Sequence, residues 1–221
     1  MATVTNSYNA TFTPSLAGSV NRLSVNQTFA NIRSGAGTAV DSSVLSAFLF
    51  SSSTTNQFQG LGRSIVLFDT SSIPSGATIV SASISATGSA RVSTLGTTDI
   101  VAVSSNPAST SALAASDYST LGTTSFGSIS SASFLPTGIN VFTLNASGLS
   151  NITKNGISKF GFVLDWDRSG TFSGTWASTQ LTEYDIVFAS PVLAVSYTVD
   201  FPTLSFNNIS SLSNVTTITT S

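Results

Sequence analysis

The chain has 221 residues, 41% of them hydrophobic, which is enough to bury the core of one large domain. Only 7% of the residues are charged and the net charge is −2, which excludes the basic clusters that bind a nucleic-acid backbone. Cysteine and histidine are absent, which excludes a disulfide framework, a thiol metal site and a histidine-activated serine. We therefore expect neither an enzyme nor a nucleic-acid-binding protein.

The surface should consist mainly of hydroxyl groups. Serine (44 residues) and threonine (31 residues) together make up roughly a third of the chain, well above ordinary usage. No segment approaches 18 consecutive apolar residues, and residues 1–13 lack the pattern of a secretory signal. We therefore expect that the protein does not contact a membrane. We also expect that it assembles in a reducing cytoplasm, where cysteine-free chains are typical.

Short apolar or alternating runs separated by turns predict strands along most of the chain. Pro14 to Gly18 predicts a turn, and Asn145 could cap one short helix at 146–153. Many short strands indicate an all-β sandwich or barrel. The runs fall at 2–13, 20–29, 44–50, 65–68, 79–86, 90–92, 99–103, 126–134, 140–144, 160–166, 175–178, 185–189 and 191–199.

Residues 63–86 contain the clearest pair of strands. The apolar run at 65–68 predicts a strand buried on both faces. Pro74 and Gly76 then favour a turn, because proline presets φ and glycine tolerates positive φ. Alternation at 79–86 predicts a second strand with one face toward the core.

A sequence signature runs through the same stretch, at Arg63, Phe68, Asp69, Pro74, Gly76, Ile79 and Ala82. In this signature the chain resembles the DNRLRE family of jelly-roll modules. Segments 116–128, 139–152 and 156–167 agree with that family, and the resemblance spans about residues 28–200. It implies a jelly-roll β-sandwich, and it implies a cell-surface protein or, more closely, a phage virion protein.

The pattern changes after residue 200, so we divide the chain into a jelly-roll domain at 1–200 and a tail at 201–221. In the tail, apolar residues recur at every third position from 206 to 218. This spacing fits neither a strand nor an α-helix, but it suits an extended helix with three residues per turn or a strand wrapped around a three-sided prism. We expect an oligomerisation or anchoring segment that packs against copies of itself or inserts into a neighbour; a disordered tail is the alternative. The apolar residues of the tail are Phe206, Ile209, Leu212, Val215 and Ile218.

Two carboxylates flank Trp166 near the end of a predicted strand. On a strand, Asp165 and Asp167 would face the same way. They could contribute to a calcium site, which takes 6–8 oxygen ligands, or form a glycosidase pair. The alternative is a structural role, in which they pair with Arg168 or with backbone amides.

Other residue types also leave two interpretations open. Trp166, Trp176 and Tyr184 could line a sugar-binding platform, although aromatic residues in β-sandwiches usually belong to the core. Arg63 and Asp69 are rare charges about 20 Å apart on an extended segment, so they cannot pair with each other. We expect each to hold a loop or a sheet end in place.

The leading hypothesis is a non-enzymatic structural subunit of the virion surface, such as a phage head fibre, a capsid decoration protein or a tail-associated protein. We expect a homo-oligomer, most simply a trimer, that contacts other virion proteins. One alternative is a carbohydrate-binding adhesion module on a virion or cell surface. Another is the subunit of an extracellular filament in which one subunit's strand completes the next subunit's sheet.

Overall fold

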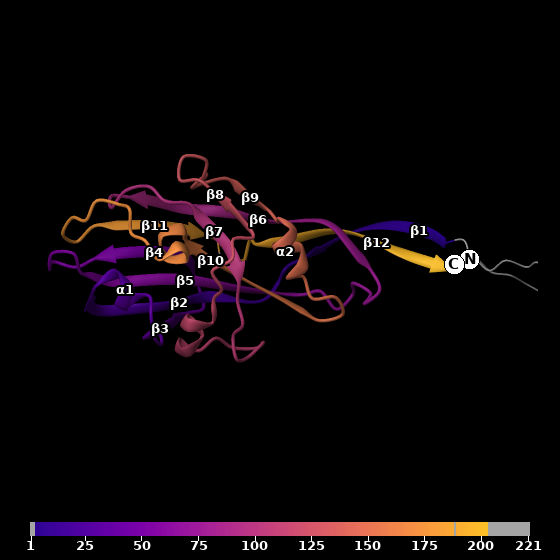
Figure 1. The fold of residues 1–221 in the computed structure, drawn as a ribbon, viewed down its shortest axis with the longest axis horizontal. Helices are drawn as coiled ribbons and strands as arrows, with labels where there is room; N and C mark the ends of the chain where they lie inside the picture. The colour runs from indigo at the N-terminus through magenta and orange to yellow at the C-terminus, as the bar shows by residue number, and fades with distance from the viewer. Residues whose placement is uncertain (1–2, 188, 203–221) are drawn as a thin grey trace, which may run out of the picture.

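The structure, a computed structural model, describes residues 3–187 and 189–202 and shows an all-β protein (Figure 1). The strands are β1 (Thr3–Phe12), β2 (Pro14–Gln27), β3 (Ala39–Asp41), β4 (Leu45–Ser51), β5 (Phe58–Asp69), β6 (Thr78–Ser93), β7 (Ile100–Ser104), β8 (Gly127–Ile129), β9 (Ile139–Thr143), β10 (Ile157–Leu164), β11 (Leu181–Ile186) and β12 (Val192–Pro202). The helices are short: α1 (Phe29–Ile32), the 3₁₀ helix η1 (Ala115–Thr120), α2 (Ala146–Ser150) and α3 (Asp165–Ser169). Within the described part of the chain, no helix is long and apolar enough to cross a bilayer.

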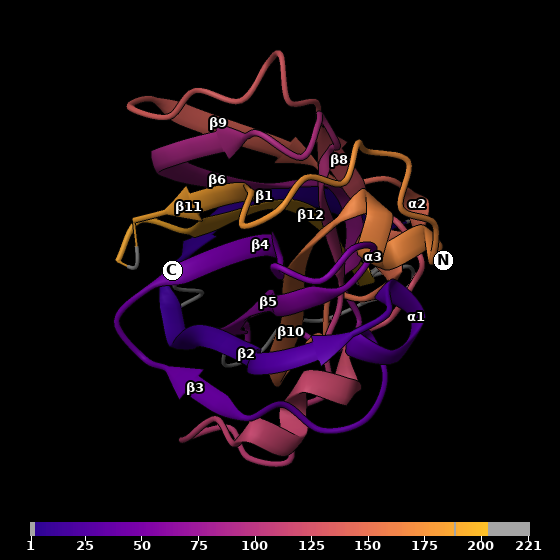
Figure 2. The ribbon, with the colours of Figure 1, turned by 90° about the vertical axis from the view of Figure 1, so that its left-hand side faces the viewer.

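All strand pairs are antiparallel, and one hydrogen-bonded path runs in the order β1-β12-β6-β11-β4-β5-β10-β7-β8. β9 joins β6, while β2 pairs with β5 and carries β3. Viewed along the long axis, β9 and β6 lie on one side, and β5, β10 and β2 lie on the other (Figure 2). The predicted all-β, jelly-roll-like sandwich is therefore confirmed.

The long strand β6 lets one continuous sheet form two layers, because it changes partner along its length. Its first part pairs with β12, and its middle, Ser83 to Thr87, pairs with β9. Its last part, from Gly88 to Ser93, pairs with β11 instead. The layer that contains β9 and β6 can thus face the layer that contains β5 and β10 across a shared core.

Aromatic side chains fill the space between the layers. Phe142 of β9 meets Phe162 of β10 with ring centroids 4.8 Å apart. Phe160, also on β10, contacts both Phe68 and Phe126 in edge-to-face geometry. Such pairs contribute beyond simple area burial, so this core accounts for much of the stability of the sandwich.

The central strand pair matches its sequence pattern. Ile65 through Phe68 of β5 are fully buried on both faces, as predicted. In β6, Ala82, Ile84 and Ala86 are buried while the serines between them are more exposed. Short helix α2 also forms where expected, and the Gly148 amide donates to the Asn145 side chain at 3.1 Å.

Four local predictions are wrong. The turn predicted at 14–18 is instead the start of β2, where proline is tolerated as the first residue of a strand. The strand predicted at 126–134 ends at Ile129, and Ser130 to Ser133 form a turn closed by a hydroxyl pair. Residues 175–178 form no strand. The strand predicted at 185–189 is instead β11 at Leu181–Ile186, whose buried face begins with Thr182 and Tyr184 and therefore does not form an aliphatic run in the sequence.

Candidate functional site

Strands β1 and β12 form a two-stranded extension, which we call the terminal ribbon. It projects beyond the sandwich and brings both ends of the described chain to one pole (Figure 1). Its register runs without a break from the Thr3–Pro202 pair to the Phe12–Leu193 pair. Near the sandwich β12 also pairs with β6, but that pairing stops at Thr198. Within residues 3–187 and 189–202, the outermost rungs therefore consist of β1 and β12 alone.

The two faces of the terminal ribbon differ in chemistry, because successive residues of a strand point to opposite faces. On one face, Thr5 donates a hydrogen bond to Asp200, and Ser196 donates one to Asn9 across the ribbon. The other face is mostly apolar and includes a stacked pair, Tyr8 and Tyr197, with ring centroids 5.4 Å apart. The apolar face carries, from the tip inward, the register pairs Val4–Phe201, Asn6–Val199, Tyr8–Tyr197, Ala10–Val195 and Phe12–Leu193.

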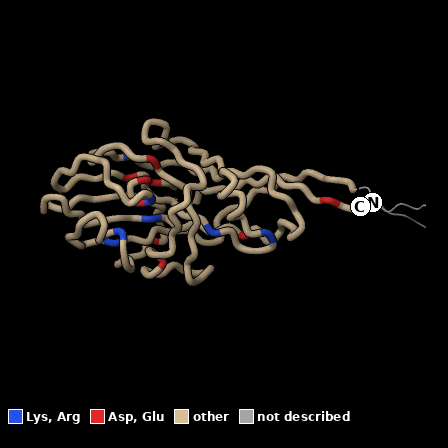
Figure 3. Tube along the Cα trace, in the orientation of Figure 1, with Lys and Arg blue, Asp and Glu red and all other residues tan. Residues whose placement is uncertain are grey.

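The apolar face is buried at its inner end and exposed at its outer end. Leu193 is fully buried in the core of the sandwich. By contrast, Val4 is 47% exposed, Phe201 45% and Tyr8 39%. The ribbon also carries a single charged residue among its described positions, Asp200 (Figure 3). A lone two-stranded ribbon is marginally stable in water, so this outer apolar face is a candidate contact surface.

The second site is a buried ionic cluster of Arg33, Arg63 and Asp167, which we call the Arg–Asp node. Arg63 is bidentate on the Asp167 carboxylate, with Nε to Oδ2 at 2.7 Å and Nη2 to Oδ1 at 2.8 Å. Arg33 Nε donates to Asp167 Oδ1 at 3.1 Å and to the Asp167 carbonyl at 2.8 Å. Charge-assisted, bidentate bonds of this kind are short and directional, so the node fixes the position of α3.

Arg63 ties further segments to the node. Its guanidinium donates to the carbonyl oxygens of Tyr118 and Arg33, and it lies 4.0 Å from the centre of the Tyr118 ring. The Tyr118 hydroxyl donates in turn to the Ile32 carbonyl at 2.7 Å. Four segments far apart in the sequence, around α1, β5, η1 and α3, thus meet at one buried arginine.

Burial and charge act in opposite directions on the titration of these groups. Burial disfavours the charged guanidinium of Arg63, but the Asp167 carboxylate offsets this and raises the Arg63 pKa above its ordinary value. Burial also raises the pKa of the Tyr118 hydroxyl. Arg63 and Tyr118 therefore both keep their protons near neutral pH.

The expected arrangement of Asp165 and Asp167 on one face of a strand is wrong. The chain leaves β10 at Leu164 and turns into α3, which separates the two carboxylates. Asp167 is buried in the node, whereas Asp165 is partly exposed and accepts from Arg168 Nε at 2.6 Å. Among the described residues, no group of three acidic side chains could hold a metal ion.

The three aromatic residues considered for a sugar platform lie mainly in the core. Tyr184 is fully buried, and its hydroxyl donates to the Thr98 carbonyl. Trp166 is also buried; it packs edge-on against Phe172, with ring centroids 4.8 Å apart. Trp176 is half-buried, and its indole N–H donates to the Gln57 carbonyl at 3.0 Å. Two of the three rings are therefore not available at the surface for stacking on a sugar.

Arg63 and Asp69 lie at opposite ends of the same strand segment and do not pair. Arg63 belongs to the Arg–Asp node, while the Asp69 carboxylate accepts from the Ser71 amide at 3.0 Å, in the turn after β5. Sequence reasoning missed Arg33, the second cation of the node. The available signal was its rarity, since the chain has only five arginines.

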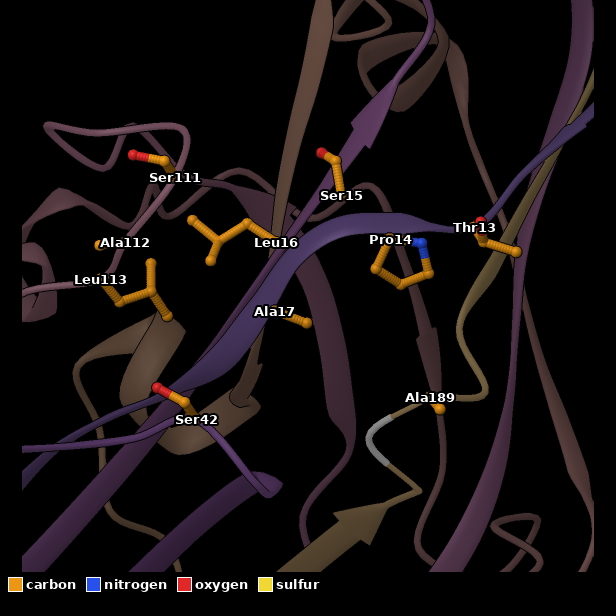
Figure 4. A pocket seen from close by; sticks show the side chains of 10 residues that line it. All are labelled: Thr13, Pro14, Ser15, Leu16, Ala17, Ser42, Ser111, Ala112, Leu113 and Ala189. Carbon is orange, nitrogen blue, oxygen red and sulfur yellow. The ribbon is translucent and has the colours of Figure 1, made fainter.

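A cavity of about 580 Å³ lies where the terminal ribbon joins the sandwich (Figure 4). Its wall is formed by residues 13–17 as the chain passes from β1 to β2, together with Ser42, Ala189 and the 111–113 loop. Leu16 and Leu113 supply its apolar surface, and hydroxyls supply its polar surface. None of the described residues that line it is charged.

Comparison with known proteins does not supply an identity. No protein-family model matches the sequence, and no curated protein matches it. The tail positions considered for oligomerisation, Phe206, Ile209, Leu212, Val215 and Ile218, lie outside the described residues.

Proposed function

We propose that this protein is a non-enzymatic structural subunit of a virion surface, which displays its sandwich outward and assembles through the terminal ribbon. The observation that carries the proposal is the exposed outer apolar face of that ribbon, formed by Val4, Tyr8 and Phe201. The resemblance of residues 63–82 to jelly-roll modules of phage virion proteins supports the virion setting. The scarcity of charge supports a passive, exposed role.

Self-association accounts for the chemistry of both ribbon faces. Apolar outer positions would be removed from water against copies of themselves, while the hydroxyl and amide face would remain solvated. Closed symmetric assemblies are the usual outcome for identical subunits. We favour a trimer, because the three-residue spacing in the sequence at 206–218 suits a three-sided assembly.

The mass of the full-length protein in solution tests this proposal. We expect an oligomer that falls to a 22.6 kDa monomer in the double variant Val4→Ser/Phe201→Ser. The matched control, Ser7→Ala/Thr198→Ala, changes one rung of the polar face and should keep the oligomer. Sedimentation equilibrium across a concentration series measures both. A wild-type monomer at all concentrations would refute assembly through the ribbon.

A second role, the subunit of a filament, is favoured by one observation. Among the described strands, β1 is the last of the hydrogen-bonded path and pairs with β12 alone, so its outer edge can accept an added strand. Strand addition at an open edge gives open-ended polymers rather than a closed oligomer. The same sedimentation series separates the roles: one discrete mass supports the trimer, and a mass that grows with concentration supports the filament.

A further inference from the structure

Most of the arginines in this weakly charged chain gather around one small cavity. Arg33, Arg63 and Arg168 line a cavity of about 220 Å³ beneath η1 and α3. Arg22 lies beside it, since its Nη1 is 3.0 Å from where a Cβ on Gly35, a lining residue, would sit. Four of the five arginines in a chain of net charge −2 are thus near one site.

Acidic side chains balance this charge only in part. Asp167 is the one carboxylate among the lining residues, and it is already shared by Arg33 and Arg63. Asp165 neutralises Arg168 from the outer side. With Arg22 counted, four cations face two carboxylates, which leaves two positive charges in excess around the cavity.

Several guanidinium N–H groups have no protein acceptor in the described part of the chain. Nε and Nη1 of Arg22 are buried and find none. All the bonds that Arg33 makes run from its Nε and Nη2, and those of Arg168 run from its Nε and Nη1. The free N–H groups of Arg33 and Arg168 belong to partly exposed side chains that line the cavity, so they are open to an acceptor that enters from solvent.

The remaining walls indicate the kind of anion. Leu121 and Val163 provide an apolar surface, and Val163 belongs to a small apolar cluster on the outer face of β10 and β7. Ser34, Ser119 and Thr123 add hydroxyl groups beside the arginines. A guanidinium fork matches the two oxygens of a carboxylate, while hydroxyls and an apolar wall suit a carbon ring that bears alcohols.

From this geometry we infer that the cavity is a binding site for the carboxylate of an acidic sugar, such as a uronic or sialic acid. Arg168 and Arg33 hold the carboxylate, and the hydroxyls of the rim contact the sugar ring. The volume admits one such residue. The site is independent of the assembly role, because it lies on the sandwich and not on the terminal ribbon.

Titration of the full-length protein, followed by amide chemical shifts in NMR, tests the site. The probes are glucuronate, N-acetylneuraminate, glucose, acetate and sulfate. We expect saturable binding of the acidic sugars with a Kd of about 1 mM, at least tenfold weaker binding of acetate, and none of glucose. The largest shifts should fall at Gly35, Leu121 and Thr123.

Two variants locate the binding, and a third serves as control. Arg168→Gln should weaken binding of the acidic sugars at least tenfold. Ser119→Tyr, at an exposed rim position, should block the cavity without removing a charge. Lys159→Gln removes one positive charge elsewhere on the surface, where Lys159 contacts Asn106, and should leave the affinity unchanged.

Three results would overturn the inference. One is the absence of saturable binding by either acidic sugar. Another is equal affinity for acetate or tighter binding of sulfate, which would indicate a general anion site. The third is equal weakening by Lys159→Gln and Arg168→Gln, which would indicate non-specific attraction. All three are distinct from a failure of assembly, because the sedimentation mass is measured on the same samples.

Discussion

The Arg–Asp node and the outer half of the terminal ribbon use polar groups in opposite ways. In the node, a buried carboxylate is surrounded by two arginines, and both of its oxygens accept hydrogen bonds within the protein. In the ribbon, polar side chains form single cross-strand contacts at an exposed surface, such as Thr5 with Asp200. Burial makes the first kind of contact costly to disturb, while solvent can replace the second.

This contrast indicates where the chain fixes its shape and where it leaves apolar surface exposed. The node joins segments from Arg33 to Asp167 and has little tolerance for substitution. The ribbon depends on backbone pairing and leaves Val4, Tyr8 and Phe201 exposed. Substitutions in the sandwich should therefore affect folding, and substitutions at the ribbon tip should affect association.

Removing the node carboxylate should have the largest effect. Asp167→Ala leaves Arg33 and Arg63 without their shared counter-charge, so we expect the free energy of unfolding to fall by about 3–5 kcal/mol. Asp165→Ala is the matched control: it breaks a partly exposed ion pair and should cost less than about 1 kcal/mol. Urea denaturation monitored by tryptophan fluorescence gives both values. Equal losses would show that burial of the node does not matter.

Removing a single tyrosine hydroxyl should give a smaller loss of stability, and the size of that loss should differ between the sandwich and the terminal ribbon. Tyr184→Phe leaves the buried Thr98 carbonyl without its donor, which should cost about 1–2 kcal/mol. Tyr197→Phe in the terminal ribbon keeps the ring stacked on Tyr8 and should change stability by less than about 0.5 kcal/mol. Thermal unfolding of the two variants checks this, and a larger loss for Tyr197→Phe would reverse the comparison.

The smallest expected effect concerns Glu183 and Asp185 on β11. Burial raises the pKa of both carboxyls; the charge of Asp185 adds to the effect on Glu183, and the Ser46 hydroxyl opposes it. A raised pKa means that the folded state disfavours the charged form. These groups therefore reduce stability above their folded pKa, and the penalty disappears as the pH falls below the unfolded value of about 4.

The double variant Glu183→Gln/Asp185→Asn should be more stable than the wild type near pH 7, by up to about 1 kcal/mol, and equal to it near about pH 2.5, below both unfolded pKa values. Asp69→Asn is the control in which the change in stability should have the opposite sign: the variant should be less stable than the wild type near pH 7. The reason is that hydrogen bonds from the Ser71 side chain and amide lower the Asp69 pKa. Its wild-type contribution is present above the unfolded pKa and is lost on acidification. Urea denaturation at both pH values measures the differences; an undiminished double-variant gain near about pH 2.5 would exclude the pKa explanation.

The sequence was a good guide to regular, periodic elements. The fully apolar run at 65–68 lies in the last part of β5, and the alternating run at 79–86 lies in the first part of β6. Both were predictable because burial on two faces gives a continuous apolar run and burial on one face gives alternation. The Asn145 cap of α2 was also predictable, since it depends on residues only three apart. Strand periodicity and helix capping could be predicted because both depend on residues that are close together in the sequence.

The node could not be derived from spacing. Arg63 meets a carboxylate 104 residues away, and Arg33 meets the same group across 134 residues. The strand predicted at 160–166 runs past the end of β10 at Leu164, because apolar spacing alone does not show that a helix begins at Asp165. The exposed apolar face of the terminal ribbon could not be predicted either, because alternation within a strand does not indicate which other strand it pairs with.

The register of the terminal ribbon has a mechanical consequence. Residues 3 and 202 are opposite each other on its outermost rung, so tension applied between them would peel β1 from β12 one rung at a time. Tension between residue 202 and the far tip of the sandwich would instead load the rungs together, along the strand direction. The same hydrogen bonds would thus break one by one under a force that separates residue 3 from residue 202, and would resist together a force that pulls residue 202 away from the sandwich.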